Sequence, residues 1–205
     1  DKKPEEKKEP EEKPVKLSLK ELPKNLRLFI IISSIFALGH FGYAFLLLRA
    51  KNIGLADNIA ILLYVLFYVV YTICIIPSGI LSDKIGREPV LMTGYLVFAI
   101  TSFGLIYTSN IYSVLLFFVI YGIFYAMIDG VQRAFVVDLA PKHLKATALG
   151  TFHAAIGMVA LPGGFIAGLL WDKISPETTF LYGFILAIIS IVLFIFMKDK
   201  TKIVN

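Results

Sequence analysis

The chain has 205 residues, 58% of them hydrophobic, and its mean hydropathy is +0.79. So much apolar surface excludes an ordinary soluble domain of this length. The net charge of +5 does not indicate nucleic-acid binding, because the Lys and Arg residues gather at the ends of apolar runs and in the N-terminal segment.

The residues with reactive side chains do not indicate an enzyme or a metalloprotein. Cys74 is the only cysteine in the sequence, and no Cys/His cluster has the spacing of metal ligands. The sequence contains no Ser/His/Asp constellation and no phosphate-binding loop. We therefore expect no catalytic residue, no metal site and no cofactor.

The first 24 residues are a repetitive charged segment. Lys, Glu and Pro dominate it, and apolar residues are almost absent. Such a segment cannot form a hydrophobic core, so residues 1–24 are predicted to be a disordered linker. The folded domain is predicted to occupy residues 25–205.

Six apolar segments follow, each long enough to cross a membrane as a helix. They cover residues 27–48, 58–81, 89–108, 111–132, 146–170 and 178–197. The sequence therefore predicts an all-α, polytopic membrane protein, a bundle of six transmembrane helices with the lipid bilayer around it.

The distribution of positive charge predicts the orientation. If residues 1–24 are cytoplasmic, ten Lys and Arg residues near the segment ends fall inside and three fall outside. We therefore expect a multi-pass protein of the cell membrane with both ends of this chain in the cytoplasm.

A short echo in the sequence indicates an internal repeat. Residues 81–88 follow the second apolar segment, residues 170–177 follow the fifth, and five of the eight positions are identical. Chance is the alternative explanation. If the echo marks two three-helix units, the odd number of helices inverts the second unit, which gives a 3+3 inverted repeat.

The loop after the second segment carries a motif. It reads Gly79-Ile80-Leu81-Ser82-Asp83-Lys84-Ile85-Gly86-Arg87. This motif resembles the signature loop of the major facilitator superfamily, which joins helices two and three and again helices eight and nine. Glu88 departs from the pattern, because a second basic residue is usual there.

Further stretches support the resemblance. Residues 133–153 and 161–172 are similar to helices ten and eleven of prokaryotic members, although Lys145-Ala146 stands where Arg-Gly is common. The resemblance covers residues 25–200 and implies helices 7–12 of a twelve-helix transporter. It implies a substrate site near the midplane, alternating access, and a cytoplasmic connector at residues 1–24. The partner would be an N-terminal six-helix half of the same polypeptide or a second copy.

Two functions remain open at this point. The first is secondary active transport of a small molecule, with no covalent chemistry. The second is a non-transporting membrane adaptor or sensor with the same fold. Six further spans preceding Asp1 would favour the transporter.

Asp83 in the signature loop needs a counter-charge. An unpaired carboxylate at the membrane edge is costly. We expect Asp83 to pair with Arg133, whose planar guanidinium suits a carboxylate, and we expect Asp129 to share that arginine from one turn away.

The other residues of the loop have simpler expected roles. Gly79 and Gly86 allow close backbone approach and a tight turn. Lys84 and Arg87 can reach lipid headgroups. The alternative is that the loop only sets the topology through its charge.

The fifth segment contains a proline flanked by small residues. Proline removes a backbone hydrogen bond and bends a helix, whereas small residues let helices pack closely. Packing is the expected role and a hinge is the alternative for Gly157, Pro162, Gly164 and Gly168.

His153 lies in the same segment. We expect it to hydrogen-bond to a neighbouring helix, with a proton relay as the alternative. No acidic residue is expected at mid-depth in any span, which weakens the relay.

Polar side chains within the spans predict a substrate cavity, since such groups face protein or water. Residue counts place His40, Tyr68 and Tyr121 near mid-depth. Tyrosine suits an amphipathic or aromatic solute. The alternative is that several tyrosines, Tyr64 above all, are interface anchors or bond between helices. The predicted lining is His40, Tyr43, Tyr68, Tyr71, Thr72, Tyr121 and Tyr125.

Overall fold

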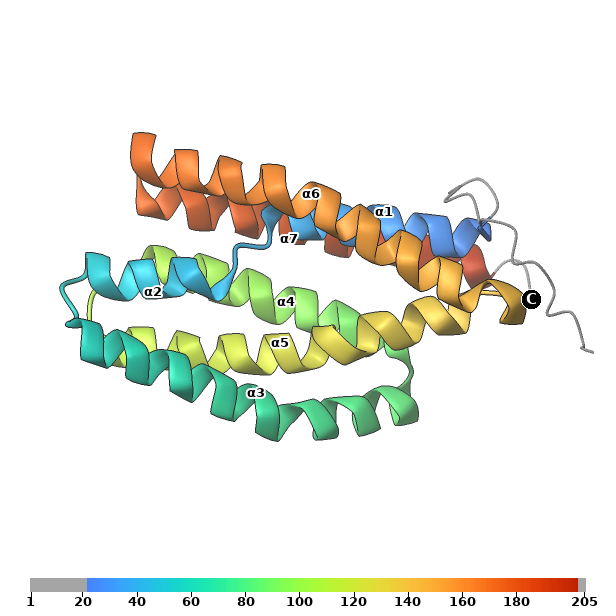
Figure 1. The fold of residues 1–205 in the computed structure, drawn as a ribbon, viewed down its shortest axis with the longest axis horizontal. Coiled ribbons are helices and arrows are strands. Elements are labelled where there is room, and N and C mark those ends of the chain that lie inside the picture. Colours follow the sequence, from blue (N-terminus) through green and yellow to red (C-terminus); the bar gives the residue numbers. More distant parts are fainter. Residues whose placement is uncertain (1–21, 203–205) are drawn as a thin grey trace, which may run out of the picture.

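The computed structural model describes the backbone of residues 22–202 and the side chains of residues 22–197. Most of the linker predicted at residues 1–24 lies outside this range. The described part is almost entirely helical (Figure 1), in the order α1 (Lys24–Gly39), α2 (Tyr43–Asn52), α3 (Asp57–Ile85), α4 (Arg87–Ile106), α5 (Ile111–Leu139), η2 (Lys142–Leu144), α6 (Lys145–Lys173) and α7 (Pro176–Lys202).

These elements form six helical spans long and apolar enough to cross a membrane, which confirms the predicted all-α membrane fold. Several bounds differ from the prediction. The loop expected over residues 82–88 shrinks to Gly86, because α3 ends at Ile85 and α4 begins at Arg87. The fourth span runs to Leu139 rather than to residue 132.

The first span is broken in its middle, which the sequence prediction missed. α1 ends at Gly39, and α2 starts after Gly42 (Figure 1). A broken helix leaves backbone groups without intrahelical partners, and these are costly in a membrane. Two tyrosines from other helices satisfy two of the carbonyls at this break. The Tyr121 hydroxyl donates to the Phe41 carbonyl at 2.6 Å, and the Tyr182 hydroxyl donates to the Leu38 carbonyl at 3.0 Å.

Glycines let neighbouring helices reach the backbone at this break. A Cβ atom on Gly163 of α6 would lie 2.5 Å from the Leu38 carbonyl oxygen, and one on Gly183 of α7 would lie 2.9 Å from that of Gly39. Both distances are too short for real side chains. Because Gly163 and Gly183 have no side chain, α6 and α7 can pack directly against the backbone at the break.

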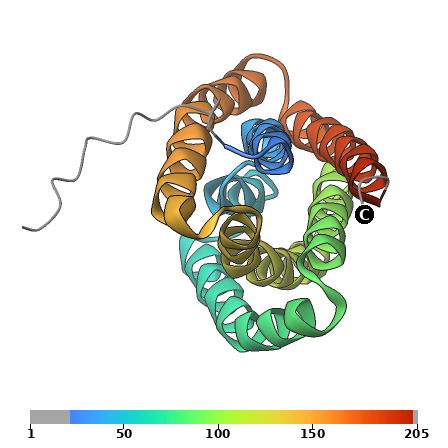
Figure 2. The same cartoon turned by 90° about the vertical axis from the view of Figure 1, so that its right-hand side faces the viewer.

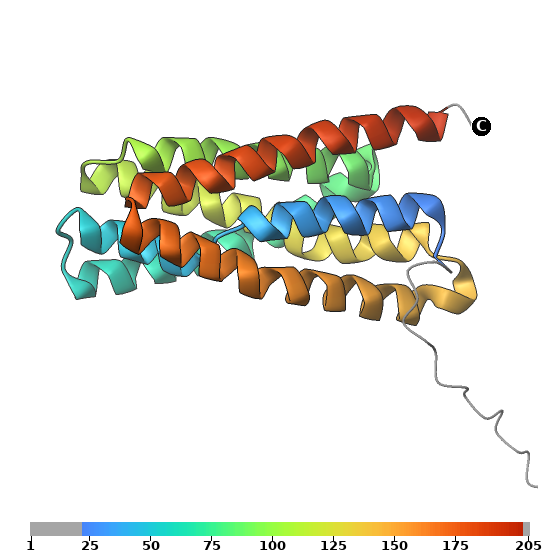
Figure 3. The ribbon, with the colours of Figure 1, turned by 90° about the horizontal axis from the view of Figure 1, so that it is seen from above.

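The helices pack around α1 and α5. α1 lies against α6 and α7, whereas α5 lies against α3 and α4 (Figures 2 and 3). Phenylalanine rings fill the space between them: Phe29 packs edge-on to Phe135 at 4.7 Å and stacks on Phe152 at 5.9 Å. This packing fixes the relative positions of the three helices that surround the site described next.

Two spans are much more exposed than the others. The most apolar windows of α3 and of the η2–α6 span bury 17% and 11% of their residues, against 33–50% for the other four. Both spans lie at the margin of the bundle in the end-on view (Figure 2). Their free surfaces are therefore available to lipid or to further protein.

Candidate functional site

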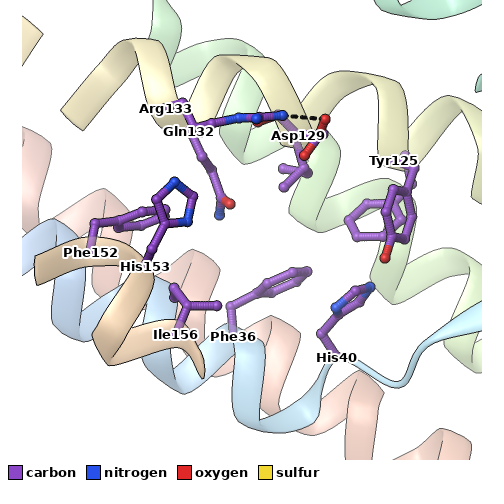
Figure 4. Close-up of a pocket in the computed structure, with 11 residues that line it drawn as sticks. Phe36, His40, Tyr125, Asp129, Gln132, Arg133, Phe152, His153 and Ile156 are labelled. Carbon is purple, nitrogen blue, oxygen red and sulfur yellow. Dashed lines mark hydrogen bonds and ion pairs between the residues drawn. The ribbon is translucent and has the colours of Figure 1, made fainter. Parts of the chain in front are cut away.

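A pocket of about 230 Å³ opens beside the helix break, between α1, α5 and α6. Figure 4 shows Asp129, Gln132 and Arg133 along the α5 wall, with Phe36 and Ile156 on the opposite side. Aromatic and apolar side chains dominate the lining, as in most small-molecule sites. The lining residues are Phe36, His40, Phe124, Tyr125, Ile128, Asp129, Gln132, Arg133, Phe152, His153 and Ile156.

His40 occupies the end of the pocket next to the break. Its Nε2 atom lies 3.1 Å from the hydroxyl oxygen of Tyr121, which in turn donates to the Phe41 carbonyl. The rings of Phe98 and Phe124 lie 5.3 Å from the imidazole. The break thus places one polar ring inside an aromatic wall.

Asp129 is the acidic group of the pocket. Its Oδ2 atom accepts a hydrogen bond from the Tyr71 hydroxyl at 2.9 Å and forms an ion pair with Arg133. Arg133 Nε also donates to the Asp129 carbonyl at 2.9 Å. The two charged side chains remain 37% and 49% exposed, so both can reach a ligand in the pocket.

Asp129 also lies deeper than the sequence prediction placed it. α5 continues for ten residues beyond Asp129 to Leu139, which is about 15 Å of helix. The expectation that no acidic residue lies near mid-depth depended on ending the fourth span at residue 132, and the longer α5 removes that basis.

A second polar chain supports the wall of the pocket. Gln132 Nε2 donates to the Tyr95 hydroxyl at 3.1 Å, and that hydroxyl lies 3.3 Å from Ser33 Oγ. Tyr95 is fully buried and stacks on Phe36 with ring centroids 4.0 Å apart. Polar groups from α1, α4 and α5 are joined in this way behind the aromatic lining.

The structure brings together only some of the predicted cavity residues. His40 and Tyr125 line the pocket, and Tyr71 reaches it through Asp129. Tyr121 is fully buried and is not among the lining residues, but its hydroxyl contacts His40. Three others lie on separate surfaces: Tyr68 and Thr72 on the outer face of α3, and Tyr43 in a groove with Tyr64.

Tyr43, Tyr64 and Tyr68 form a ladder of rings of their own. The Tyr43 and Tyr64 centroids are 5.0 Å apart, and those of Tyr64 and Tyr68 are 4.9 Å apart. Tyr68 is 42% exposed. This ladder is a distinct aromatic surface along α2 and α3.

His153 lines the pocket from α6, opposite Tyr125 (Figure 4). Within the described residues it packs against the Phe152 ring at 5.4 Å and makes no hydrogen bond to another helix. The expected bond to a neighbouring helix is therefore not present there.

The signature loop has a tight turn at Gly86 that is followed directly by Arg87. Gly86 adopts φ +97°, a backbone conformation that favours glycine. Arg87 Nη1 lies 2.6 Å from Asp83 Oδ1 and 2.5 Å from Ser82 Oγ, and its Nε lies 3.3 Å from Asp138 Oδ2. One side chain therefore links the end of α3 to the end of α5.

The predicted pairing of Asp83 with Arg133 is wrong. Within the described residues Arg133 pairs with Asp129, and Asp83 pairs with Arg87. The reason is local geometry, because Asp129 and Arg133 lie one turn apart on α5, whereas Asp83 and Arg87 lie on either side of the turn at Gly86. Because α3 continues to Ile85 and α4 begins at Arg87, only Gly86 separates the two helices, and Arg87 lies close to Asp83 across this turn.

The glycines predicted to pack in α6 have no neighbour among the described residues. A Cβ atom on Gly157, Gly164 or Gly168 would have nothing within 4 Å, and the same is true of Gly79 in α3. Pro162 lies inside a continuous α6. Among the described glycines of α6, the one that packs closely on another helix is Gly163.

Comparison with known proteins identifies the family to which a chain with this architecture belongs. The family model described as Major Facilitator Superfamily matches residues 27–205. An uncharacterized MFS-type transporter of Methanocaldococcus jannaschii is 48% identical over 188 residues, which are 89% of this chain and 47% of that protein.

Two relatives have names that state a function. The multi-drug resistance efflux pump PmrA of Streptococcus pneumoniae serotype 4 is 31% identical over 59% of this chain and 30% of its own length. The multidrug transporter MdfA of Edwardsiella piscicida is 33% identical over 48% of this chain and 24% of its own length. The chain thus spans about half the length of the first of these relatives, and the matches cover less of the other two. The match over nearly all of its described residues shows that the chain belongs to the Major Facilitator Superfamily.

Proposed function

We propose that this chain is the C-terminal six-helix half of a secondary active transporter that moves a small solute by alternating access. The observation that carries the proposal is the pocket beside the broken first span. It combines an aromatic wall with an accessible Asp129–Arg133 pair well inside the span. Charged groups at such depth are costly and mark functional sites in membrane proteins.

The lining of the pocket supports an aromatic, amphipathic solute. Phe36, Phe124 and Tyr125 present ring surfaces, whereas His40 and Asp129 offer polar contacts at separate points of the wall. The names of the two multidrug relatives agree with a solute of this kind. No covalent step is needed, because the solute only has to bind and be released.

The exposed faces of α3 and α6 support a partner half. These spans flank the pocket and leave most of their apolar surface uncovered. Gly157, Gly164 and Gly168 of α6 would pack against that partner, as small residues do between membrane helices. This chain covers about half the length of the first relative, which favours an N-terminal half of the same polypeptide over a second copy.

The proposed arrangement in the membrane follows the charge distribution. Both ends of the chain lie in the cytoplasm of a plasma-membrane protein, and residues 1–24 connect the halves. The six helices form two inverted units of three, in accord with the echo between residues 81–88 and 170–177.

A transport screen tests the proposal. The full-length protein is reconstituted into proteoliposomes, and a panel of aromatic amphipathic solutes is offered with and without an imposed proton or sodium gradient. We expect gradient-dependent movement of at least one solute, and its loss in Asp129→Asn. A folded protein that moves no solute under any gradient would favour the non-transporting adaptor or sensor.

A further inference from the structure

His40 sits in a hydrogen-bond chain whose direction can be worked out. The Phe41 carbonyl can only accept, so the Tyr121 hydroxyl, 2.6 Å away, must donate its single proton there. The contact between His40 Nε2 and the same hydroxyl, at 3.1 Å, then needs a proton from the imidazole. His40 Nε2 therefore carries hydrogen.

The other ring nitrogen, Nδ1, belongs to a side chain that lines the pocket. A neutral imidazole has one N–H and one bare nitrogen, so a proton on Nε2 leaves Nδ1 as an acceptor. Within the described residues, no hydrogen bond to His40 Nδ1 is present and no carboxylate forms an ion pair with the ring. The surrounding Phe36, Phe98 and Phe124 rings favour the neutral form over an unpaired charge.

We infer that Tyr121 fixes His40 as the Nε2–H tautomer, so that Nδ1 accepts a hydrogen bond from an N–H or O–H group on a flat aromatic ligand. The inference rests on the proposed function and names the chemistry by which that site selects its solute. The broken span is what makes the arrangement possible, since it frees the Phe41 carbonyl that orients Tyr121.

The size and lining of the pocket specify the rest of the ligand. About 230 Å³ accommodates a one- or two-ring molecule, and the Phe36 and Phe124 rings provide surfaces for stacking. A ligand without a donor loses the bond to Nδ1 and leaves that nitrogen desolvated. Donor-bearing and donor-free versions of one ring system should therefore bind with different affinities.

Indole and 1-methylindole are a matched pair of probes, because they differ in a single N–H group. The full-length protein, labelled with ¹⁵N-histidine and held in nanodiscs, is titrated with each probe while the His40 ring nitrogens are followed by NMR. His40 is assigned by its absence in His40→Gln. We expect a protonated Nε2 and a bare Nδ1, and a shift of Nδ1 on adding indole that 1-methylindole does not reproduce.

Two substitutions separate ligand recognition from structural support. Gln can place an amide donor near the position of Nε2, which keeps the bond to Tyr121 but removes the Nδ1 acceptor. Asn places an amide near the position of Nδ1 and gives up the bond to Tyr121. We expect His40→Gln to bind indole about five- to tenfold more weakly and His40→Asn to bind it nearly as well as the wild type. A purely structural role for His40 predicts the reverse order.

Several results would overturn the inference. These are a proton on Nδ1, equal shifts with both probes, no shift with either probe at saturation, or an affinity for indole retained in His40→Gln. None of these measurements needs a gradient or net transport. The inference can therefore fail while solute transport is demonstrated, and it can hold in a protein that moves no solute.

Discussion

Arg49 Nη1 lies 2.7 Å from Glu177 Oε1, which ties the last turn of α2 to the first turn of α7 across 128 residues of sequence. The guanidinium is almost fully buried. It also donates to Thr108 Oγ1 at 3.2 Å and to the carbonyls of Ile106 and Thr108 at 3.2 and 3.1 Å. The break separates the short α2 helix from α1. The Arg49 side chain fixes this helix to α4 and α7 instead.

Replacing Arg49 should destabilise the bundle. Arg49→Leu leaves two carbonyls and Glu177 without their donor, and we expect a loss of about 2–4 kcal/mol in the free energy of unfolding. Thermal unfolding in detergent measures this as a lower Tm. Lys51→Ala is the matched control, because the Lys51–Asp57 pair is exposed and contributes little. A wild-type Tm in Arg49→Leu would contradict the assignment.

Gly163 and Gly164 give a second test, since they are neighbours in α6 with opposite surroundings. Gly163→Ala forces a methyl group against the Leu38 carbonyl, and we expect it to cost about 1–3 kcal/mol of stability. The methyl group of Gly164→Ala meets nothing among the described residues and should leave the stability of the bundle unchanged or slightly raised. If Gly164 packs on the partner half, its substitution should instead slow transport. Equal Tm values for the two variants would refute the close packing at the break.

The Arg87 contacts predict a local effect on the C-terminal ends of α3 and α5. Arg87→Ala removes the bonds to Asp83, Ser82 and Asp138 together, so amide hydrogen exchange should rise at both helix ends. Lys84→Ala is the control, because Lys84 is exposed and has no ion pair within the described residues. Unchanged exchange at the end of α5 in Arg87→Ala would show that the arginine does not couple the two helices.

Topology can be tested with single cysteines. In a background with Cys74 replaced by Ser, His143→Cys and Ser109→Cys place exposed thiols at opposite ends of the bundle. Ser82 is unsuitable, because it is only 1% exposed and bonds to Arg87. An impermeant maleimide added to intact cells should label residue 109 and spare residue 143 until the membrane is opened. Labelling of both in intact cells would contradict the six-span topology.

The sequence was sufficient to predict the six spans and the family, because both depend on apolar run length and on the residues of one loop. It was insufficient for the break at residues 40–42. Hydropathy does not register a change of backbone direction inside an apolar run, although Gly39 and Gly42 on either side of His40 were a usable signal. The break depends on Gly163, Gly183, Tyr121 and Tyr182 from distant helices, which no local pattern reveals.

The candidate site was only partly predictable for a related reason. Helical periodicity places residues on one face of their own helix but not against a particular neighbour. Tyr68 and Tyr71 were therefore grouped together, whereas the structure directs Tyr71 to Asp129 and leaves Tyr68 on the outer surface of α3. Asp83 was assigned a distant arginine because α3 was ended too early. Both errors concern tertiary packing and helix length rather than residue chemistry.

The central claim is that solute occupies the pocket between α1, α5 and α6. Its most direct test is the protection of a cysteine placed there. Ile156→Cys lines the pocket, and Leu161→Cys on the same helix is 80% exposed and lies outside the pocket lining. Both are made in the full-length protein without Cys74, and alkylation rates are measured with and without the transported solute. We predict that the solute slows alkylation at residue 156 several-fold and leaves residue 161 unchanged, whereas equal rates at residue 156 with and without a saturating solute would contradict the account.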